Sequence, residues 1–192
     1  DWFASGNWSL GHAPTASELV SIPDVAATTQ IDINNGTGFS VRSVTSAEFL
    51  SVAGAATSFL LNGDSVLSAG LRIGSGATLT ANGNLLIAGS GLNLAGGTLS
   101  AEGVTSVTNY VQSGGMLNGT GTLTAINAFN WTGGTMSGTG TTVVAAGATG
   151  TLNGPANVTQ LYRTLDIRGT LDYAATANNG SLQIYNGGHL KI

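Results

Sequence analysis

The side chains that could perform acid–base chemistry are few in this sequence and lie far apart. Its carboxylates are spread over the chain at Asp1, Glu18, Asp24, Asp32, Glu48, Asp64, Glu102, Asp166 and Asp172. Hydrolysis of a polysaccharide needs two carboxylates on one face, and a calcium site needs several oxygen ligands close together. The densest charged group contains Arg163, Asp166, Arg168 and Asp172, which we interpret as a solvated surface network. The sequence therefore predicts no catalytic residue and a protein that is not an enzyme.

Metal and nucleophile chemistry lack their usual residues as well. The chain has no cysteine, and its two histidines, His12 and His189, stand near opposite ends. A thiolate metal site or a Ser-His-Asp set is thus not expected, and neither is a cofactor. Only five residues are basic and the formal net charge is −4, which argues against nucleic acid, whose phosphates need clustered Lys and Arg. No apolar run approaches the roughly 18 residues of a membrane span.

Aromatic rings are the strongest candidates for ligand binding. Trp131, Tyr110, Tyr162 and Tyr185 fall within the repetitive part of the chain. If these rings face outward, they predict a carbohydrate-binding module, because large amphipathic rings suit sugar contacts. Two further tryptophans, Trp2 and Trp8, precede the repeats; we expect them to cap the first coil, with a sugar-stacking platform as the alternative.

Threonines form a second candidate array. Six of them flank apolar positions that repeat along the chain: Thr78, Thr80, Thr98, Thr135, Thr151 and Thr170. If the coils are in register, such side chains stack about 4.8 Å apart on one face, a pattern that suits ice or a sugar. Met116 interrupts the array and Thr is simply favourable on exposed strands. Ice binding and a degenerate polysaccharide-active enzyme therefore rank below a structural interpretation.

The elements that position these residues follow a fixed period. Apolar residues recur in steps of 16 to 20 residues at Ile22, Val41, Leu60, Leu79, Leu99, Leu117, Met136, Leu152, Leu171 and Leu190. A period near twenty is typical of a solenoid, in which each unit buries its apolar face against its neighbours. Short alternating runs such as Leu71-Arg-Ile73 and turn dipeptides such as Asn82-Gly83 predict strands and corners. The sequence thus predicts an all-β parallel solenoid of about nine coils, each of about 19 residues.

The repeat also divides the chain. Residues 1–21 do not share it and are expected to form an N-terminal capping segment, while residues 22–192 form the coils. The chain stops in mid-coil at Leu190-Lys-Ile192, so we expect the coils to continue in the natural protein.

Particular residues resemble a known group of proteins. The segment Asn7-Trp-Ser…Pro14…Glu18-Leu-Val-Ser-Ile22 precedes coils rich in Gly, Asn and Thr, and Tyr110-Val-Gln-Ser-Gly-Gly is echoed by Phe129-Asn-Trp-Thr-Gly-Gly. This pattern resembles secreted bacterial β-helix proteins, namely autotransporter passenger domains and filamentous-haemagglutinin-type repeat adhesins. The resemblance implies a right-handed parallel β-helix outside the cell or on the bacterial surface, acting as a stalk or adhesin. Implied partners are the rest of its own chain, other copies associating end to end or laterally, and host or surface glycans.

The period makes two contact predictions. The apolar residues from Leu60 to Leu171 should form one continuous buried stack. Asp172 and Lys191 each follow an apolar position of the repeat, so they should be outward neighbours in adjacent coils.

Overall fold

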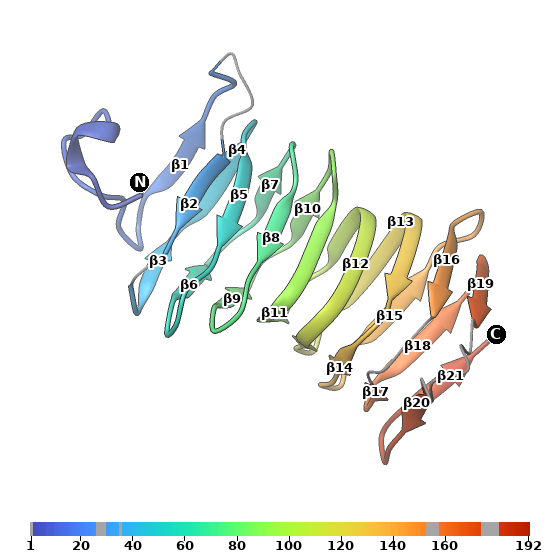
Figure 1. Ribbon diagram of the computed structural model, residues 1–192. Helices are drawn as coiled ribbons and strands as arrows, with labels where there is room; N and C mark the ends of the chain where they lie inside the picture. The colour runs from blue at the N-terminus through green and yellow to red at the C-terminus, as the bar shows by residue number, and fades with distance from the viewer. Residues whose placement is uncertain (1, 26–29, 35, 153–157, 174–180) are drawn as a thin grey trace.

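The coils follow one another along a single axis in this computed structural model, which describes residues 2–25, 30–34, 36–152, 158–173 and 181–192 (Figure 1). The fold is an all-β parallel solenoid of about seven turns, each of about 20 residues, so the turns are fewer and slightly longer than expected. One short 3-10 helix, η1 (Ser5–Asn7), precedes the strands. None of the helices within those ranges is long and apolar enough to cross a bilayer.

The strands stack into three parallel ladders, one for each side of the coil. The first ladder contains β1 (Leu19–Ile22), β4 (Ser43–Ser46), β7 (Ser65–Leu67), β10 (Leu85–Ile87), the starts of β12 (Thr105–Asn118) and β13 (Thr122–Trp131), β15 (Thr141–Val144), β18 (Thr164–Ile167) and β21 (His189–Lys191). The second contains β2 (Gln30–Ile33), β5 (Phe49–Val52), β8 (Leu71–Ile73), the start of β11 (Leu92–Ala101), the middle of β12, the end of β13, β16 (Thr149–Leu152) and β19 (Thr170–Tyr173). The third contains β3 (Phe39–Val41), β6 (Ser58–Leu61), β9 (Thr78–Ala81), the ends of β11 and β12, β14 (Gly134–Met136), β17 (Val158–Leu161) and β20 (Ser181–Ile184).

Local sequence explains the strands and the corners. In β9 the side chain of Leu79 is fully buried while its neighbours Thr78 and Thr80 are half-buried on the opposite side, as the two-residue repeat of a strand requires. Corners are crowded because successive backbones turn in contact with one another. At Gly89, where φ is +55°, an added Cβ would lie 2.6 Å from the carbonyl oxygen of Ala69, so only glycine fits there.

One buried column runs through the third ladder. Its inward side chains are, in order of the coils, Phe59, Leu79, Leu99, Leu117, Met136 and Leu161. Each is at most 2% exposed. The prediction of a stacked core is therefore confirmed for Leu79, Leu99, Leu117 and Met136.

The predicted register is wrong in the first coils. Leu60 pairs with Ser40 and Thr80 and faces outward, while Phe59 occupies the inward position. The step from Phe59 to Leu79 is 20 residues rather than the expected 19, and a slip of one residue turns a strand side chain to the other face. Ile22 lies on another ladder altogether, paired with Ser46.

The predicted register is also wrong after Met136. The next residue in its column is Leu161, 25 positions later, because this turn is longer than its predecessors. Leu152 and Leu171 lie on the second ladder, and Leu190 lies on the first.

The predicted neighbours Asp172 and Lys191 are consequently on different ladders. Asp172 pairs with Thr151, whereas Lys191 pairs with Asp166. Lys191 instead forms an ion pair with Asp166, since Lys191 Nζ lies 3.2 Å from Asp166 Oδ2.

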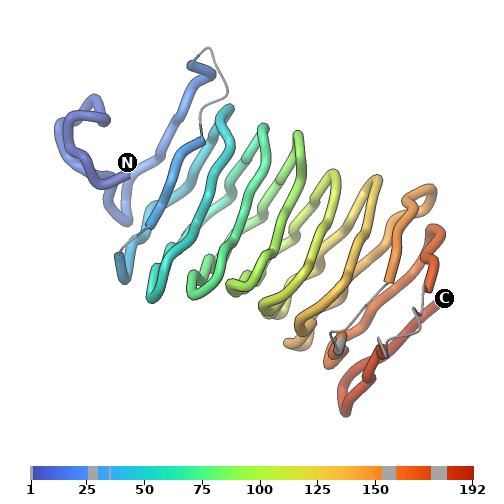
Figure 2. Tube along the Cα trace, viewed as in Figure 1, coloured from blue at the N-terminus to red at the C-terminus, as the bar shows by residue number. Residues whose placement is uncertain are grey.

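The N-terminal segment folds against the first coils (Figure 2). Trp2 is 1% exposed and packs edge-on against Trp8 and Phe59, with ring centroids 4.9 and 5.2 Å apart. Phe3 contacts Phe39 in the same region, with ring centroids 4.1 Å apart. β1 begins at Leu19 and already pairs with β4, so regular pairing starts slightly before residue 22.

Candidate functional site

Two of the four candidate aromatic rings lie inside the solenoid. Tyr110 and Trp131 are both 0% exposed, because they occupy inward positions of the second ladder: Tyr110 pairs with Leu92 and Trp131 with Gln112. They are therefore core residues and not the surface rings that a carbohydrate-binding module would use. Burial raises the pKa of Tyr110 far above its ordinary value, so its hydroxyl stays protonated.

The polar atoms of these buried rings are satisfied locally. The Tyr110 hydroxyl donates to Gln112 Oε1 at 2.7 Å, and Gln112 Nε2 donates to the Thr135 carbonyl at 3.1 Å. Trp131 Nε1 donates to the Gly133 carbonyl at 3.1 Å. This network joins neighbouring coils through the core, and its side chains are positioned for packing rather than for ligand contact.

Arg163 is a buried cation that the sequence pattern did not reveal. It is 1% exposed, and its two Nη atoms donate to the carbonyls of Ser137, at 3.2 Å, and Gly121, at 2.8 Å. Its Nε has no hydrogen-bond partner among the described residues. Burial lowers the pKa of the guanidinium, while Tyr110 and Glu102 act in the opposite direction.

Small residues create the space for this arginine. Gly138 and Gly140 precede it by one coil, and a Cβ on Gly140 would lie 2.4 Å from Arg163 Nη2. The guanidinium thus reaches through a glycine-lined corner to a carbonyl 42 residues earlier in the chain. Because its bonds go to backbone carbonyls of two coils, we interpret Arg163 as a structural tie between coils.

The other two candidate rings, the half-buried Tyr162 and the exposed Tyr185, form a pair at the surface beside the third ladder. Their rings are stacked, with centroids 4.4 Å apart and planes 4° from parallel, and Tyr185 is 38% exposed. The pKa of Tyr162 is raised, first by loss of hydration and then by the neighbouring Tyr185. These are the surface aromatics that the structure leaves available.

Two glutamines stand beside the tyrosine pair. Gln160 Nε2 donates to the Tyr185 hydroxyl at 3.3 Å, and that hydroxyl donates to Gln183 Oε1. The Thr135 hydroxyl donates to Gln160 Oε1 at 3.1 Å, which extends the network into the preceding coil. Neither glutamine was predicted from the sequence, although the repeated tripeptides Gln160-Leu-Tyr162 and Gln183-Ile-Tyr185 indicate both positions.

The threonine array is divided between two ladders. Thr78, Thr80, Thr98 and Thr135 lie together on the third ladder, where Thr78 pairs with Thr98. Thr151 and Thr170 lie on the second ladder instead. Regular threonine columns therefore extend over fewer coils than expected.

The outward side of the third ladder forms one continuous surface, which we call the polar face. Its residues, in order of the coils, are Ser58, Leu60, Thr78, Thr80, Thr98, Ser100, Met116, Asn118, Thr135, Ser137, Gln160, Tyr162, Gln183 and Tyr185. None of them is charged. Glu102 flanks this face at a corner, where its carboxylate accepts hydrogen bonds from the hydroxyls of Ser100, at 2.8 Å, and Thr120, at 2.9 Å.

The densest charged group of the sequence is also divided. Asp166 accepts hydrogen bonds from Arg168, at 2.8 Å, and from Lys191, at 3.2 Å, on the first ladder. Arg163 is buried elsewhere, and Asp172 is exposed on the second ladder. Within the described residues no group of three or more His, Asp or Glu side chains could hold a metal ion.

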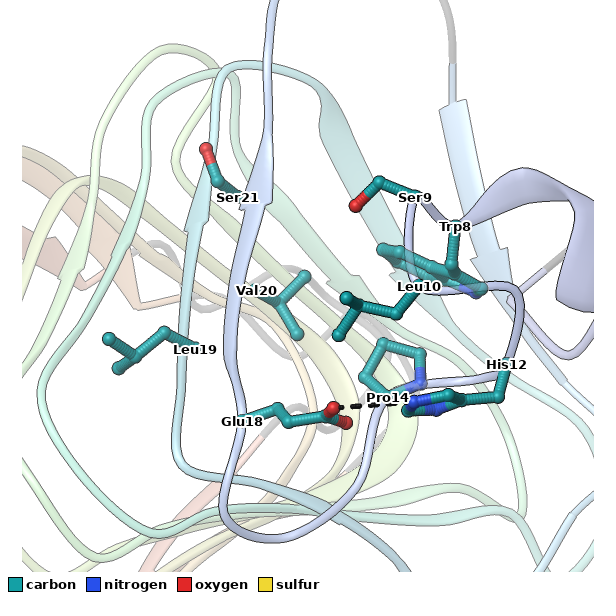
Figure 3. A pocket seen from close by; sticks show the side chains of 9 residues that line it. All are labelled: Trp8, Ser9, Leu10, His12, Pro14, Glu18, Leu19, Val20 and Ser21. Atoms are coloured by element: carbon teal, nitrogen blue, oxygen red, sulfur yellow. Dashed lines mark ion pairs between the residues drawn. The ribbon is translucent and has the colours of Figure 1, made fainter.

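A small hollow lies at the N-terminal end, beside β1. Its volume is about 180 Å³, and Trp8, Leu10, His12, Pro14 and Glu18 line it (Figure 3). The pair of His12 Nε2 and Glu18 Oε1 spans 3.6 Å.

The carboxylate of this hollow already has a structural role. Thr15 donates to Glu18 Oε2 from its backbone N–H at 2.6 Å and from its hydroxyl at 2.9 Å. These bonds lower the pKa of Glu18, the backbone bond most. We therefore interpret Glu18 as a cap for its own loop, since a carboxylate that accepts local N–H groups orders a turn.

Comparison of this chain with known protein families, with curated proteins and with solved structures yields no match.

Proposed function

We propose that this chain is a structural and adhesive segment of a large secreted or cell-surface protein, in which it acts as a rigid stalk for surface attachment or self-assembly. The observation that carries the proposal is the unbroken inward column from Phe59 to Leu161, each member at most 2% exposed. A column of this kind couples every coil to the next, so bending the rod would require separating packed side chains.

Features of the surface support a role without catalysis. The charged side chains that come together, such as Asp166 with Arg168 and Glu18 with His12, are engaged with each other or with nearby backbone. What remains outward is mainly uncharged and repeats from coil to coil on the polar face. A repeated surface on a rigid rod offers many weak contacts, whose avidity suits attachment better than turnover. The resemblance to autotransporter passengers and repeat adhesins favours the same role and an extracellular or bacterial surface location.

An attachment assay tests the proposal. The chain has no cysteine, so a single cysteine added before Asp1 would couple it to fluorescent beads in one orientation. We expect beads that carry the folded chain to resist shear on at least one of three surfaces: glass, glycan-coated glass and cultured epithelial cells. Beads coated with albumin are the control. Retention equal to that of albumin beads on all three surfaces would contradict the adhesive role.

The alternative functions are narrowed by where the residues lie. For a carbohydrate-binding module, Tyr162 and Tyr185 remain available for sugar contact, whereas Tyr110 and Trp131 are buried and do not. An ice-binding face on the third ladder would not include Thr151 and Thr170, because these two threonines lie on the second ladder. For a polysaccharide-active enzyme, Asp166 is a poor catalytic candidate because Arg168 and Lys191 already engage its carboxylate.

A further inference from the structure

The polar face differs from the other two outward surfaces in its charge. The second ladder presents Asp32, Arg72 and Asp172 in one outward column. The outward column of the first ladder contains Asp166, which is only 5% exposed, and the exposed Lys191. The polar face carries hydroxyl and amide groups over successive coils with no charge among them. Such a surface can donate and accept hydrogen bonds along its length without the cost of desolvating an ion.

From this surface we propose that the polar face binds a neutral polysaccharide lying along the rod, with Gln160, Gln183 and the Tyr162–Tyr185 pair as its strongest contacts. The proposal rests on the adhesive function above, since it names the ligand class of that function. Columns of hydrogen-bonding groups repeat about every 4.8 Å along the rod, so an extended polymer can contact several coils at once. An acidic polysaccharide fits less well, because the face has no Lys or Arg and the chain has a net charge of −4.

The geometry of the tyrosines defines how a sugar meets them. The rings stack on each other 4.4 Å apart, so each covers a face of the other and both present edges and hydroxyls beside the glutamines. The Gln183 Oε1 atom accepts from the Tyr185 hydroxyl, which orients the amide, and no hydrogen bond from its Nε2 to another described residue is present. Recognition here therefore depends on hydrogen bonds from ordered amides and hydroxyls more than on flat stacking of a sugar on a ring.

A protein partner fits the same face less well. Leu60 and Met116 are its only aliphatic members, and they stand apart on different coils. Stable protein interfaces have an apolar or aromatic core that excludes water. A face dominated by Ser, Thr, Asn and Gln instead matches the many hydroxyls of a neutral sugar chain.

Calorimetry with the intact chain tests this inference. The probes are cellohexaose, xylohexaose, mannohexaose and chitohexaose, with a galacturonate hexamer as the acidic comparison. We expect at least one neutral hexamer to bind and the acidic hexamer to bind more weakly. The double variant Gln160→Ala/Gln183→Ala should lower the affinity about tenfold, because two hydrogen bonds are lost. The matched control Asn93→Ala removes an exposed amide on the second ladder and should leave binding unchanged.

Several results would overturn the inference. These are no binding to any neutral hexamer, tighter binding of the acidic hexamer, an equal loss in the control variant, or lateral dimers that the double variant abolishes. Circular dichroism melts of both variants separate lost contacts from lost folding. Beads that attach to surfaces while the chain binds no neutral hexamer would leave the adhesive function standing without this ligand. Hexamer binding without bead attachment would support the ligand but contradict the adhesive function.

Discussion

Leu117 and Met116 are adjacent in the chain, yet the solenoid gives them opposite environments. Leu117 is fully buried between Leu99 and Met136, whereas Met116 is 38% exposed on the polar face. We predict that Leu117→Ala lowers the free energy of unfolding by about 2–5 kcal/mol, because it leaves a cavity in the column. The control Met116→Ala should change it by less than about 0.5 kcal/mol. Urea denaturation measures both, and equal losses would show that the column is not the main source of stability.

Gly140 provides a second residue-scale prediction. An added Cβ there would lie 2.0 Å from the Gly121 carbonyl oxygen and 2.4 Å from Arg163 Nη2. We predict that Gly140→Ala lowers the unfolding free energy by about 1–3 kcal/mol, as overpacking does. At Gly6 a Cβ would meet nothing within 4 Å, so Gly6→Ala is the matched control. If thermal melts of the two variants coincide, Arg163 is not held as tightly as the structure shows.

At this scale the sequence predicted residue types better than residue environments. The inward positions of Leu79, Leu99 and Leu117 follow from alternation alone. The burial of Arg163 does not follow from alternation, because glycines one and two coils away make the space that its side chain fills. The inward position of Tyr110 is equally hidden, since it replaces leucines of earlier coils in one column.

At the scale of strands, side chains at the corners bond the backbone of the next coil. Asp64 Oδ1 accepts the Asn84 N–H at 2.7 Å, and Asn84 Oδ1 accepts the Val104 N–H at 3.0 Å. Each such bond satisfies a corner amide that has no partner in a strand. Because the bonds pass from coil to coil at one position, they help to fix the register of each coil on the next.

The last strand depends on charge as well as on pairing. Asp166 on β18 accepts hydrogen bonds from Arg168 and from Lys191 on β21, and the bond from Arg168 is the largest cause of its lowered pKa. A carboxyl whose pKa is lowered in the folded state stabilises that state above its unfolded pKa. The stabilisation is lost as pH falls through the folded pKa.

We therefore predict that β21 loses protection on acidification before the central strands do. Amide exchange followed by NMR, corrected for intrinsic rates, should show falling protection at Leu190 and Lys191 below about pH 4. Asp166→Asn should remove this pH dependence, whereas Asp172→Asn, on the second ladder, should retain it. An unchanged profile in Asp166→Asn would mean that the ion pairs do not hold the strand.

Strands were more predictable from sequence than the ladder to which each belongs. Gly134-Thr-Met136 and Gly150-Thr-Leu152 have the same pattern, yet the first lies on the third ladder and the second on the second. Gly134 begins β14 with a φ of +87°, whereas Gly150 lies within β16 opposite Phe129, so the motif does not identify the ladder. The turn from Met136 to Leu161 is lengthened, and the pattern alone could not reveal that.

At the scale of the whole molecule, each coil contacts the coil before it and the coil after it. Stability in such a protein is approximately a sum of coil and interface terms. The pairing of β9 with β11 is regular, and Ala81 and Ala101 are paired positions one turn of 20 residues apart. Removal of residues 82–101 therefore deletes one complete turn.

We predict that this deletion yields a folded, shorter rod. It would bring Leu79 under Leu117, Leu71 under Tyr110 and Ser65 under Thr105, so that inward residues still meet inward residues.

Removal of residues 92–101 alone, a half-turn deletion, is the matched control. It deletes the whole of β11 and therefore places the following strands on the wrong ladders. The full-turn deletion should keep a β-sheet circular dichroism spectrum and one cooperative melt, and X-ray scattering should show a rod shorter by about 4.8 Å. The half-turn deletion should lose the cooperative melt, because a ladder shift turns polar side chains into the core. If both deletions unfold the chain, the coils are not interchangeable units, and stability depends on contacts particular to the deleted turn.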